Sequence, residues 1–327
     1  MKLTAQLHLE SVNLLRGLAA LTVGFYHFSS FFLPTDAPLN WAFSKGYLGV
    51  EAFFVISGLV IPLSFAQKSY EIGQFFTVFA KRIIRIEPAY WASILIMLSK
   101  DTVINLWYSN RLPDYNFYNL FLHFFHANAV MHAPWLRGIY WTLAIDWQFY
   151  IVVLLSFALI NRREWWIRYP IYAVFGYAHW YMPYEWLGYH VAPFGAGVVL
   201  FHYYRGYISQ RELAFALPTM ILLHWRGFDY THGLATALCC GVILFVRRAP
   251  RFFLWLGKLS YSFYLTHVFS GWAIMSGISM QTQNPWLLSV GVVVALAGSF
   301  IFAKYFYDWV EKPTLQWARA FELKIKN

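Results

Sequence analysis

The sequence predicts an all-α, polytopic integral membrane protein with about ten transmembrane helices and cytoplasmic N- and C-termini. Hydrophobic residues make up 59% of its 327 positions and charged residues only 12%, whereas a soluble domain carries about 25% charged residues. The apolar stretches are too long for the strands of a membrane barrel, so helices are expected to span the bilayer. The 16 Trp, 23 Tyr and 31 Phe residues are typical of the aromatic belts at membrane interfaces.

Ten apolar segments, separated by more polar loops, account for the expected helices. In chain order they are residues 10–28, 47–66, 88–107, 138–160, 168–182, 186–204, 212–226, 229–246, 255–276 and 286–308. They leave no room for a separate soluble domain, so residues 1–327 are expected to form a single membrane-embedded domain. The adjacent Cys239 and Cys240 lie within an apolar run and imply no disulfide framework.

Basic residues recur in every second loop between these segments. They are Lys68, Lys81, Arg82 and Arg85 after the second, Arg162, Arg163 and Arg168 after the fourth, Arg205 and Arg211 after the sixth, and Arg247, Arg248 and Arg251 after the eighth. Because lysine and arginine are retained on the cytoplasmic side, this alternation places both termini in the cytoplasm. It also accounts for the net charge of +10 without a nucleic-acid partner.

Residues 108–137 form the longest polar stretch on the opposite side of the membrane. They contain a short apolar patch, residues 120–125, which is either interfacial, re-entrant or a further span. A further span would raise the count to eleven and reverse the orientation of every later segment. The basic loops argue against that alternative.

Arg16 and His27 lie in the first segment, eleven positions apart. That spacing puts both side chains on one helix face, roughly 16 Å apart along the axis. Both groups are costly in lipid, so they are expected to line a polar path, where arginine binds anions and histidine moves protons. The alternative is an arginine that reaches the interface and a histidine at the headgroup level.

Arg82 and Arg85 share a helix face just before Pro88, which marks a helix start. Together the two guanidinium groups suit a phosphate clamp at the cytoplasmic mouth of the protein. The alternative is ordinary positive-inside anchoring of the helix.

Acidic residues inside two of the apolar segments are expected to face a cavity, because an unpaired carboxylate is expensive in lipid. Asp146 lies in the outer half of the fourth segment and either forms a dyad with His27 or makes a structural pair between helices. Glu51 stands at a helix start and is expected to line the outer end of the site. The following Ser57-Gly58 pair favours close helix packing over nucleophilic chemistry.

Two further groups of polar residues carry alternatives. Tyr261, Tyr264 and His267 follow one another at intervals of three, so they either hydrogen-bond a ligand or form a packed polar seam. His123, His126 and His132 match no compact metal-ligand spacing, and no metal site is expected.

Taken together, these segments resemble the acyltransferase type 3 family of bacterial inner-membrane O-acyltransferases. The matching motifs are Arg16-x10-His27, Gly49-Val-Glu51-x-Phe-Phe-Val-Ile-Ser57-Gly58, Arg82-x-x-Arg85-x-x-Pro88-x-Tyr90-Trp91, Trp141-Thr-Leu-x-x-Asp146-x-x-Phe-Tyr150 and Ser260-Tyr261-x-x-Tyr264-x-x-His267. They run in the family's order and cover the chain nearly end to end. The family usually has Glu at position 146 and often Asp at position 51, and both changes keep the charge.

The resemblance implies a multi-pass protein of the bacterial inner membrane that transfers an acyl group, usually acetyl, from cytoplasmic acyl-CoA to a hydroxyl of a glycan. The acceptor is expected to be a lipid-linked saccharide or an envelope polysaccharide such as O-antigen or exopolysaccharide. Acetyl-CoA is then a donor substrate, and no permanently bound cofactor is expected.

On this resemblance, His27 is the catalytic base or a transient acyl carrier, and Asp146 orients it. The residues expected to bind acyl-CoA are Arg16, Arg82, Arg85 and Tyr264, and those expected to bind the acceptor are Glu51, Trp141 and His267. The alternative function is a proton-coupled transporter or flippase of a lipid-linked sugar, which would move its substrate without consuming CoA.

Overall fold

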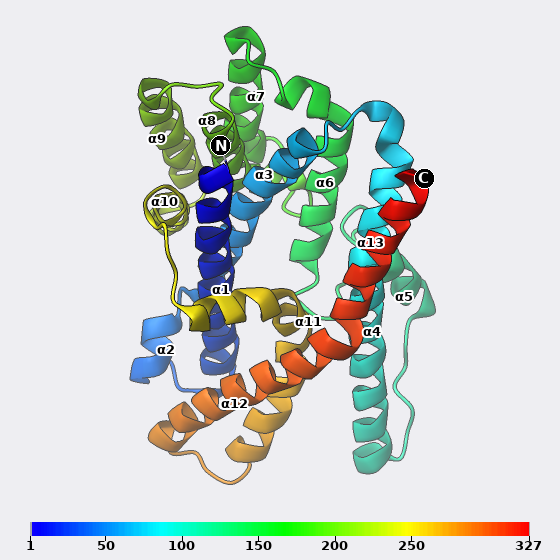
Figure 1. The fold of residues 1–327 in the computed structure, drawn as a ribbon. Coiled ribbons are helices and arrows are strands. Elements are labelled where there is room, and N and C mark those ends of the chain that lie inside the picture. Colours follow the sequence, from blue (N-terminus) through cyan, green and yellow to red (C-terminus); the bar gives the residue numbers. More distant parts are fainter. Residues whose placement is uncertain (1, 327) are drawn as a thin grey trace. The chain divides into compact units, whose positions relative to one another are not determined.

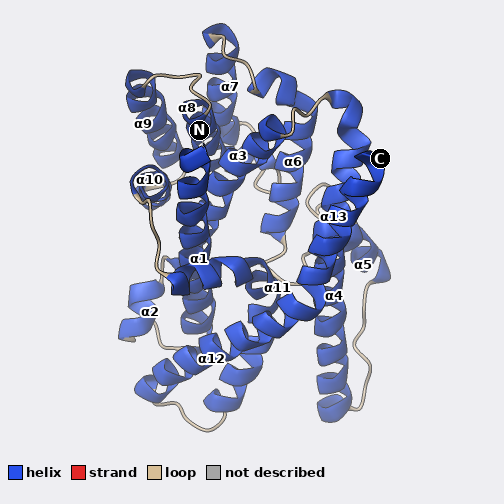
Figure 2. Cartoon of the chain, in the orientation of Figure 1, coloured by secondary structure: helices blue, strands red, loops and turns tan. Residues whose placement is uncertain are grey.

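The computed structural model describes the backbone of residues 2–326 and the side chains of residues 10–321. Within residues 2–326 every regular element is a helix and none is a strand (Figures 1 and 2). The prediction of an all-α protein is therefore confirmed.

Each of the ten predicted segments coincides with a helix. These helices are α1 (Lys2–Phe32), α3 (Gly49–Gln67), α4 (Phe75–Ser109), α6 (Trp141–Ile160), α7 (Trp165–Tyr177), α8 (Val191–Tyr204), α9 (Gln210–Gly227), α10 (Tyr230–Phe245), α11 (Arg251–Ser279) and α12 (Pro285–Phe306). Residues 2–326 contain three further α-helices: α2 (Pro38–Phe43), α5 (Phe117–Phe124) and α13 (Lys312–Lys326). A turn of π-helix, Tyr307–Glu311, connects α12 to α13.

Among the described residues, three helical runs are long and apolar enough to cross a membrane by length and composition. They are Pro38–Gln67, Trp141–Ile160 and Pro285–Phe321, whose most apolar windows have mean hydropathies of 2.0, 2.0 and 2.2. Helix α10 is also apolar but shorter. The number of crossings and the cytoplasmic placement of the termini stay predictions.

The chain divides into two compact units. Unit 1 comprises Met1–Val23, Lys45–Phe75 and Asn128–Lys258, and unit 2 comprises Gly24–Ser44, Phe76–Ala127 and Leu259–Asn327. The single membrane domain expected from the sequence stays a prediction.

Within unit 1, α3 packs closely against α8 through small residues. A Cβ on Gly58 would clash with the Phe194 carbonyl, and a Cβ on Gly197 would lie 2.8 Å from the Cα of Gly58. Glycine at both positions therefore lets the two backbones meet, as small residues do at membrane-helix interfaces. This confirms that Gly58 serves close helix packing.

Within unit 2, the short helix α5 turns back along α4 (Figure 1). Its eight residues span about 12 Å, too short for a bilayer core of about 30 Å. At its end, His123 Nδ1 lies 3.0 Å from the Tyr90 hydroxyl on α4. Tyr90 stands nineteen residues, or about 28 Å, before the last residue of α4. The patch at 120–125 therefore lies in a segment that returns along α4, on a helix too short to span by itself, and its place in the membrane stays a prediction.

Candidate functional site

Two histidines face each other in unit 2. His27 on α1 and His267 on α11 have ring centroids 5.3 Å apart. The two helices approach closely because α11 has a glycine at this level, Gly271, where a Cβ would clash with the ring of Phe28. The structure thus brings together two residues that the sequence separates by more than two hundred positions.

The hydrogen bonds of His267 fix which of its nitrogens is basic. Its Nδ1 lies 3.0 Å from the Phe263 carbonyl and 2.9 Å from the Tyr264 carbonyl. Carbonyl oxygens only accept hydrogen bonds, so Nδ1 carries the proton and Nε2 keeps its lone pair. Nε2 is buried and has no hydrogen-bond partner among the described residues. A buried imidazole lone pair therefore stands next to His27.

The predicted phosphate clamp lies on a turn of α4 that neighbouring helices hold in place. Pro88 lies inside α4 and lacks the N–H that would complete the preceding turn. The Thr314 hydroxyl on α13 donates to the Arg85 carbonyl at 2.9 Å, and the Tyr261 hydroxyl on α11 donates to the Ile86 carbonyl at 3.1 Å. These two carbonyls follow the one that Pro88 leaves without its helical donor, that of Ile84, so the bonds anchor the turn to neighbouring helices.

Charges around this turn distinguish its two arginines. Glu87 and Glu311 are both buried, and together with Arg82 they act electrostatically on the Tyr261 hydroxyl. Arg82 is half-buried, whereas Arg85 is exposed. Of the pair, Arg85 is therefore the guanidinium better placed to meet an anion from solution.

Sequence reasoning missed a buried polar cluster directly beyond the clamp. His126 Nε2 lies 3.0 Å from Glu87 Oε1, and the His126 ring stacks on Tyr90 at 4.6 Å. His126 adopts the left-handed backbone conformation, with φ of 52°. Burial and the neighbouring His126 lower the pKa of His123 to about 4, so His123 is neutral when it bonds Tyr90. The signal was available: two histidines three apart at the end of an apolar patch that was too short to span.

In unit 1, Asp146 accepts a hydrogen bond of 2.5 Å from Ser57. This bond joins α6 to α3 and gives a carboxylate inside an apolar helix a polar neighbour. The predicted Arg16 also belongs to unit 1, where its side chain is half-buried. The proposed pairing of Asp146 with His27, which belongs to unit 2, stays a prediction.

Unit 1 also gathers imidazoles around Glu51. The carboxylate of Glu51 lies 3.8 Å from His224 Nε2 and 3.9 Å from His232 Nε2. Trp141, predicted to bind the acceptor, packs against His190 with ring centroids 4.8 Å apart. No motif in the sequence singled out these three histidines.

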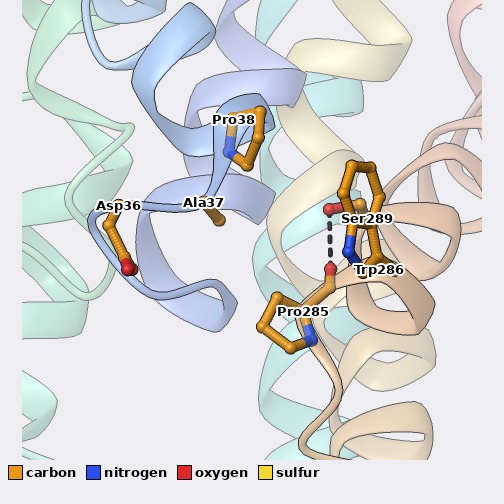
Figure 3. A pocket seen from close by; sticks show the side chains of 6 residues that line it. All are labelled: Asp36, Ala37, Pro38, Pro285, Trp286 and Ser289. Carbon is orange, nitrogen blue, oxygen red and sulfur yellow. Dashed lines mark hydrogen bonds between the residues drawn. The ribbon is translucent and has the colours of Figure 1, made fainter.

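A pocket of about 190 Å³ opens in unit 2 between the loop after α1 and the start of α12 (Figure 3). It is lined by Asp36, Ala37, Pro38, Pro285, Trp286 and Ser289. The Ser289 hydroxyl donates to the Pro285 carbonyl at 2.7 Å, so its polar group is engaged within the helix. None of the predicted site residues lines this pocket.

Comparison with known proteins identifies the family. The family model described as "Acyltransferase domain" matches residues 9–304, which contain all five motifs. The chain therefore belongs to the acyltransferase type 3 family, and together with its apolar helices this defines a membrane acyltransferase. Thr314, which holds the clamp turn, lies beyond the matched segment.

Two curated proteins are similar to the chain. One is named "Putative acetyltransferase ORF330", from Acidianus two-tailed virus, and is 24% identical over 284 residues, covering 78% of this chain and 81% of the relative. The other is "Regulator of hypoxia-inducible factor 1" from Caenorhabditis elegans, 26% identical over 121 residues, covering 35% of this chain and 24% of the relative. No solved structure matches.

Proposed function

We propose that the protein transfers an acyl group, acetyl in the simplest case, from cytoplasmic acyl-CoA to a hydroxyl of an envelope or exported glycan. The family supplies the acyl-transfer chemistry, and the name of the similar viral protein favours acetyl. One observation carries the proposal. His27 stands beside His267, whose proton is fixed on Nδ1, in the same unit as the turn that carries Arg82 and Arg85.

The phosphates of the donor are bound by the exposed Arg85 and by the half-buried Arg82. Guanidinium groups bind phosphate oxygens with paired hydrogen bonds. Because Thr314 and Tyr261 fix the carbonyls of this turn, little freedom is lost when the donor binds. A thioester is already activated, so transfer needs a base and a positioned acceptor.

His27 acts as the general base. It takes the proton of the acceptor hydroxyl as that oxygen attacks the thioester carbonyl, and the C–S bond then breaks. The CoA sulfur leaves with the proton that His27 gives back, so atoms and charge balance. The lone pair on His267 Nε2 stabilises the charged form of His27 between these two steps.

A covalent route uses the same residue. His27 would attack the thioester itself, release CoA and pass the acyl group to the hydroxyl afterwards. Incubation with labelled acetyl-CoA in the absence of acceptor separates the routes, because only the covalent route leaves label on the protein. The proposed location in both cases is the bacterial cytoplasmic membrane, with acyl-CoA on its inner side.

The test is acyl transfer in membranes from cells that express the protein, with acetyl-labelled acetyl-CoA and a full glycan extract. Label is expected in base-labile glycan material. His27→Ala should reduce transfer about 10²- to 10⁴-fold, the usual contribution of a general base. His132→Asn is the matched control, because His132 is an exposed histidine with φ of 49°, a conformation that asparagine tolerates.

Normal transfer by His27→Ala would show that the mechanism is wrong. Proton-coupled movement of a lipid-linked sugar without release of CoA would show that the protein is a transporter.

A further inference from the structure

The carboxylate of Glu51 is buried without a hydrogen-bond partner for one of its oxygens. Glu51 lies in the first turn of α3, is 8% exposed, and its Oε2 has no hydrogen-bond partner among the described residues. The start of the helix lowers the cost of a negative charge but does not remove it. A buried carboxylate normally needs a cation or several donors around it.

Two imidazole nitrogens face this carboxylate across a short gap. His224 Nε2 lies 3.8 Å from Oε2, and His232 Nε2 lies 3.9 Å from Oε1. Both distances exceed a hydrogen bond, which ends near 3.2 Å. One bridging atom can lie about 2.8 Å from both ends of either gap.

Both imidazoles are held from the side away from Glu51. His232 Nδ1 lies 3.1 Å from Asp229 Oδ1, and His224 Nδ1 lies 2.9 Å from Thr236 Oγ1. A carboxylate accepts only, so the Nδ1 of His232 carries a proton and its Nε2 presents a lone pair to Glu51 when the ring is neutral. The Glu51 oxygens and His232 Nε2 are then acceptors, and His224 Nε2 is one as well in the tautomer whose Nδ1 donates to the Thr236 hydroxyl.

An aromatic wall adjoins the gap. The Phe228 ring lies 5.1 Å from the His224 ring and 5.0 Å from the His232 ring, and Tyr189 packs on Phe228 at 4.9 Å. The side chains of His232 and Glu51 are 18% and 11% exposed, so each keeps a small accessible part, whereas Oε2 of Glu51 is buried. Aromatic faces beside a carboxylate favour cations.

We propose that Glu51, His224 and His232 bind a primary ammonium group, with Phe228 as the adjoining wall. An ammonium group has three donors for the acceptors that face the gap, and its positive charge offsets the buried carboxylate. A neutral hydroxyl supplies one donor and no charge. The inference rests on the proposed function for the rest of the ligand, which is then a glycan acceptor that contains an amino sugar.

The test measures binding of three matched monosaccharides by the purified protein in detergent, by saturation-transfer NMR without any acyl-CoA. Glucosamine carries the ammonium group, glucose has a hydroxyl in its place, and N-acetylglucosamine has a neutral amide. Glucosamine is expected to bind about tenfold or more tightly than the other two, as for a lost hydrogen bond to a charged group.

Glu51→Gln keeps the shape of the side chain and removes its charge, so it should abolish the preference for glucosamine. Glu71→Gln is the control, because Glu71 is an exposed carboxylate in the same unit. The comparison of the three sugars on the unmodified protein stands even if Glu51→Gln does not fold.

Equal binding of the three sugars, no binding of glucosamine, or an unchanged preference in Glu51→Gln would each overturn the inference. These outcomes are separate from the proposed function, since acyl transfer from acetyl-CoA can persist when the ammonium site is refuted. Conversely, glucosamine binding without any acyl transfer would refute only the proposed function.

Discussion

Thr314→Val tests whether the turn that carries Arg85 is held by α13. The Thr314 hydroxyl is buried, and its single proton is shared between the Arg85 carbonyl at 2.9 Å and the Glu311 carbonyl at 2.8 Å. Valine has the same shape without the hydroxyl. The substitution therefore removes the hydrogen bond while leaving the packing of α13 against α4 in place.

The expected loss of acetyl-CoA binding follows from the free energy of that one hydrogen bond. A net hydrogen bond contributes about 1 kcal/mol, and more when a buried carbonyl is left without a donor. If this free energy is lost from the ordered turn, binding of the donor phosphates weakens about fivefold. We expect the KM for acetyl-CoA to rise by that factor, with kcat within about twofold, because the transferred group lies elsewhere on the donor.

The assay is the rate of acetyl transfer in membranes as a function of acetyl-CoA concentration. Thr314→Ser keeps the hydroxyl and should restore the KM, which separates the hydrogen bond from any effect of reduced volume. An unchanged KM in Thr314→Val, or a fall in kcat at constant KM, would refute the argument that this bond positions the clamp.

Three further outcomes follow from the packing and the charges. Gly197→Ala places a Cβ 2.8 Å from the Gly58 Cα and should destabilise unit 1 by about 1–3 kcal/mol. The destabilisation should be measured as a lower melting temperature in detergent. An unchanged melting temperature would contradict the close contact between α3 and α8. Ser57→Ala removes the 2.5 Å hydrogen bond to Asp146 and should lower the free energy of unfolding by about 1.5–3 kcal/mol, measured from the melting temperature in the same way. Ser64→Ala is the control, because the Ser64 hydroxyl donates to the Ile61 carbonyl within its own helix. The pKa of His123 is lowered from 6.5 to about 4, so the unfolded chain takes up this proton at a higher pH than the folded protein does, and stability should fall as the pH drops from about 6.5 to 4. His123→Gln should reduce this dependence of the melting temperature on pH. An identical pH dependence in the variant would exclude His123 as its source.

The helices could be predicted because a long apolar run between charged loops must satisfy its backbone hydrogen bonds internally, which a helix does. The start of α4 could not be predicted, since the sequence places Lys81, Arg82 and Arg85 in a loop, whereas helix runs through them from Phe75. The hydrophobic pattern marks only the part of a helix that is apolar. Helix continues past it wherever backbone hydrogen bonds can form, and Pro88 lies inside α4.

The site was predictable only where spacing along one helix decides which residues share a face. Tyr264 and His267 are three apart on α11, and the structure joins them through the Tyr264 carbonyl. Two contacts depend instead on which helices pack together: His27 with His267, and Glu87 with His126. Hydrophobic periodicity in a single sequence predicts the helices but not their packing partners. The predicted partnership of His27 with Asp146 remains for mutagenesis to decide.

Acyl transfer from labelled acetyl-CoA by the unmodified protein and by His27→Ala tests the central claim most directly. We predict base-labile label on glycan material with the unmodified protein and with His132→Asn, and a loss of about 10²-fold or more with His27→Ala. Equal label from the His27→Ala membranes, with the protein present at its normal level, would contradict the assignment of His27 as the group that carries the reaction.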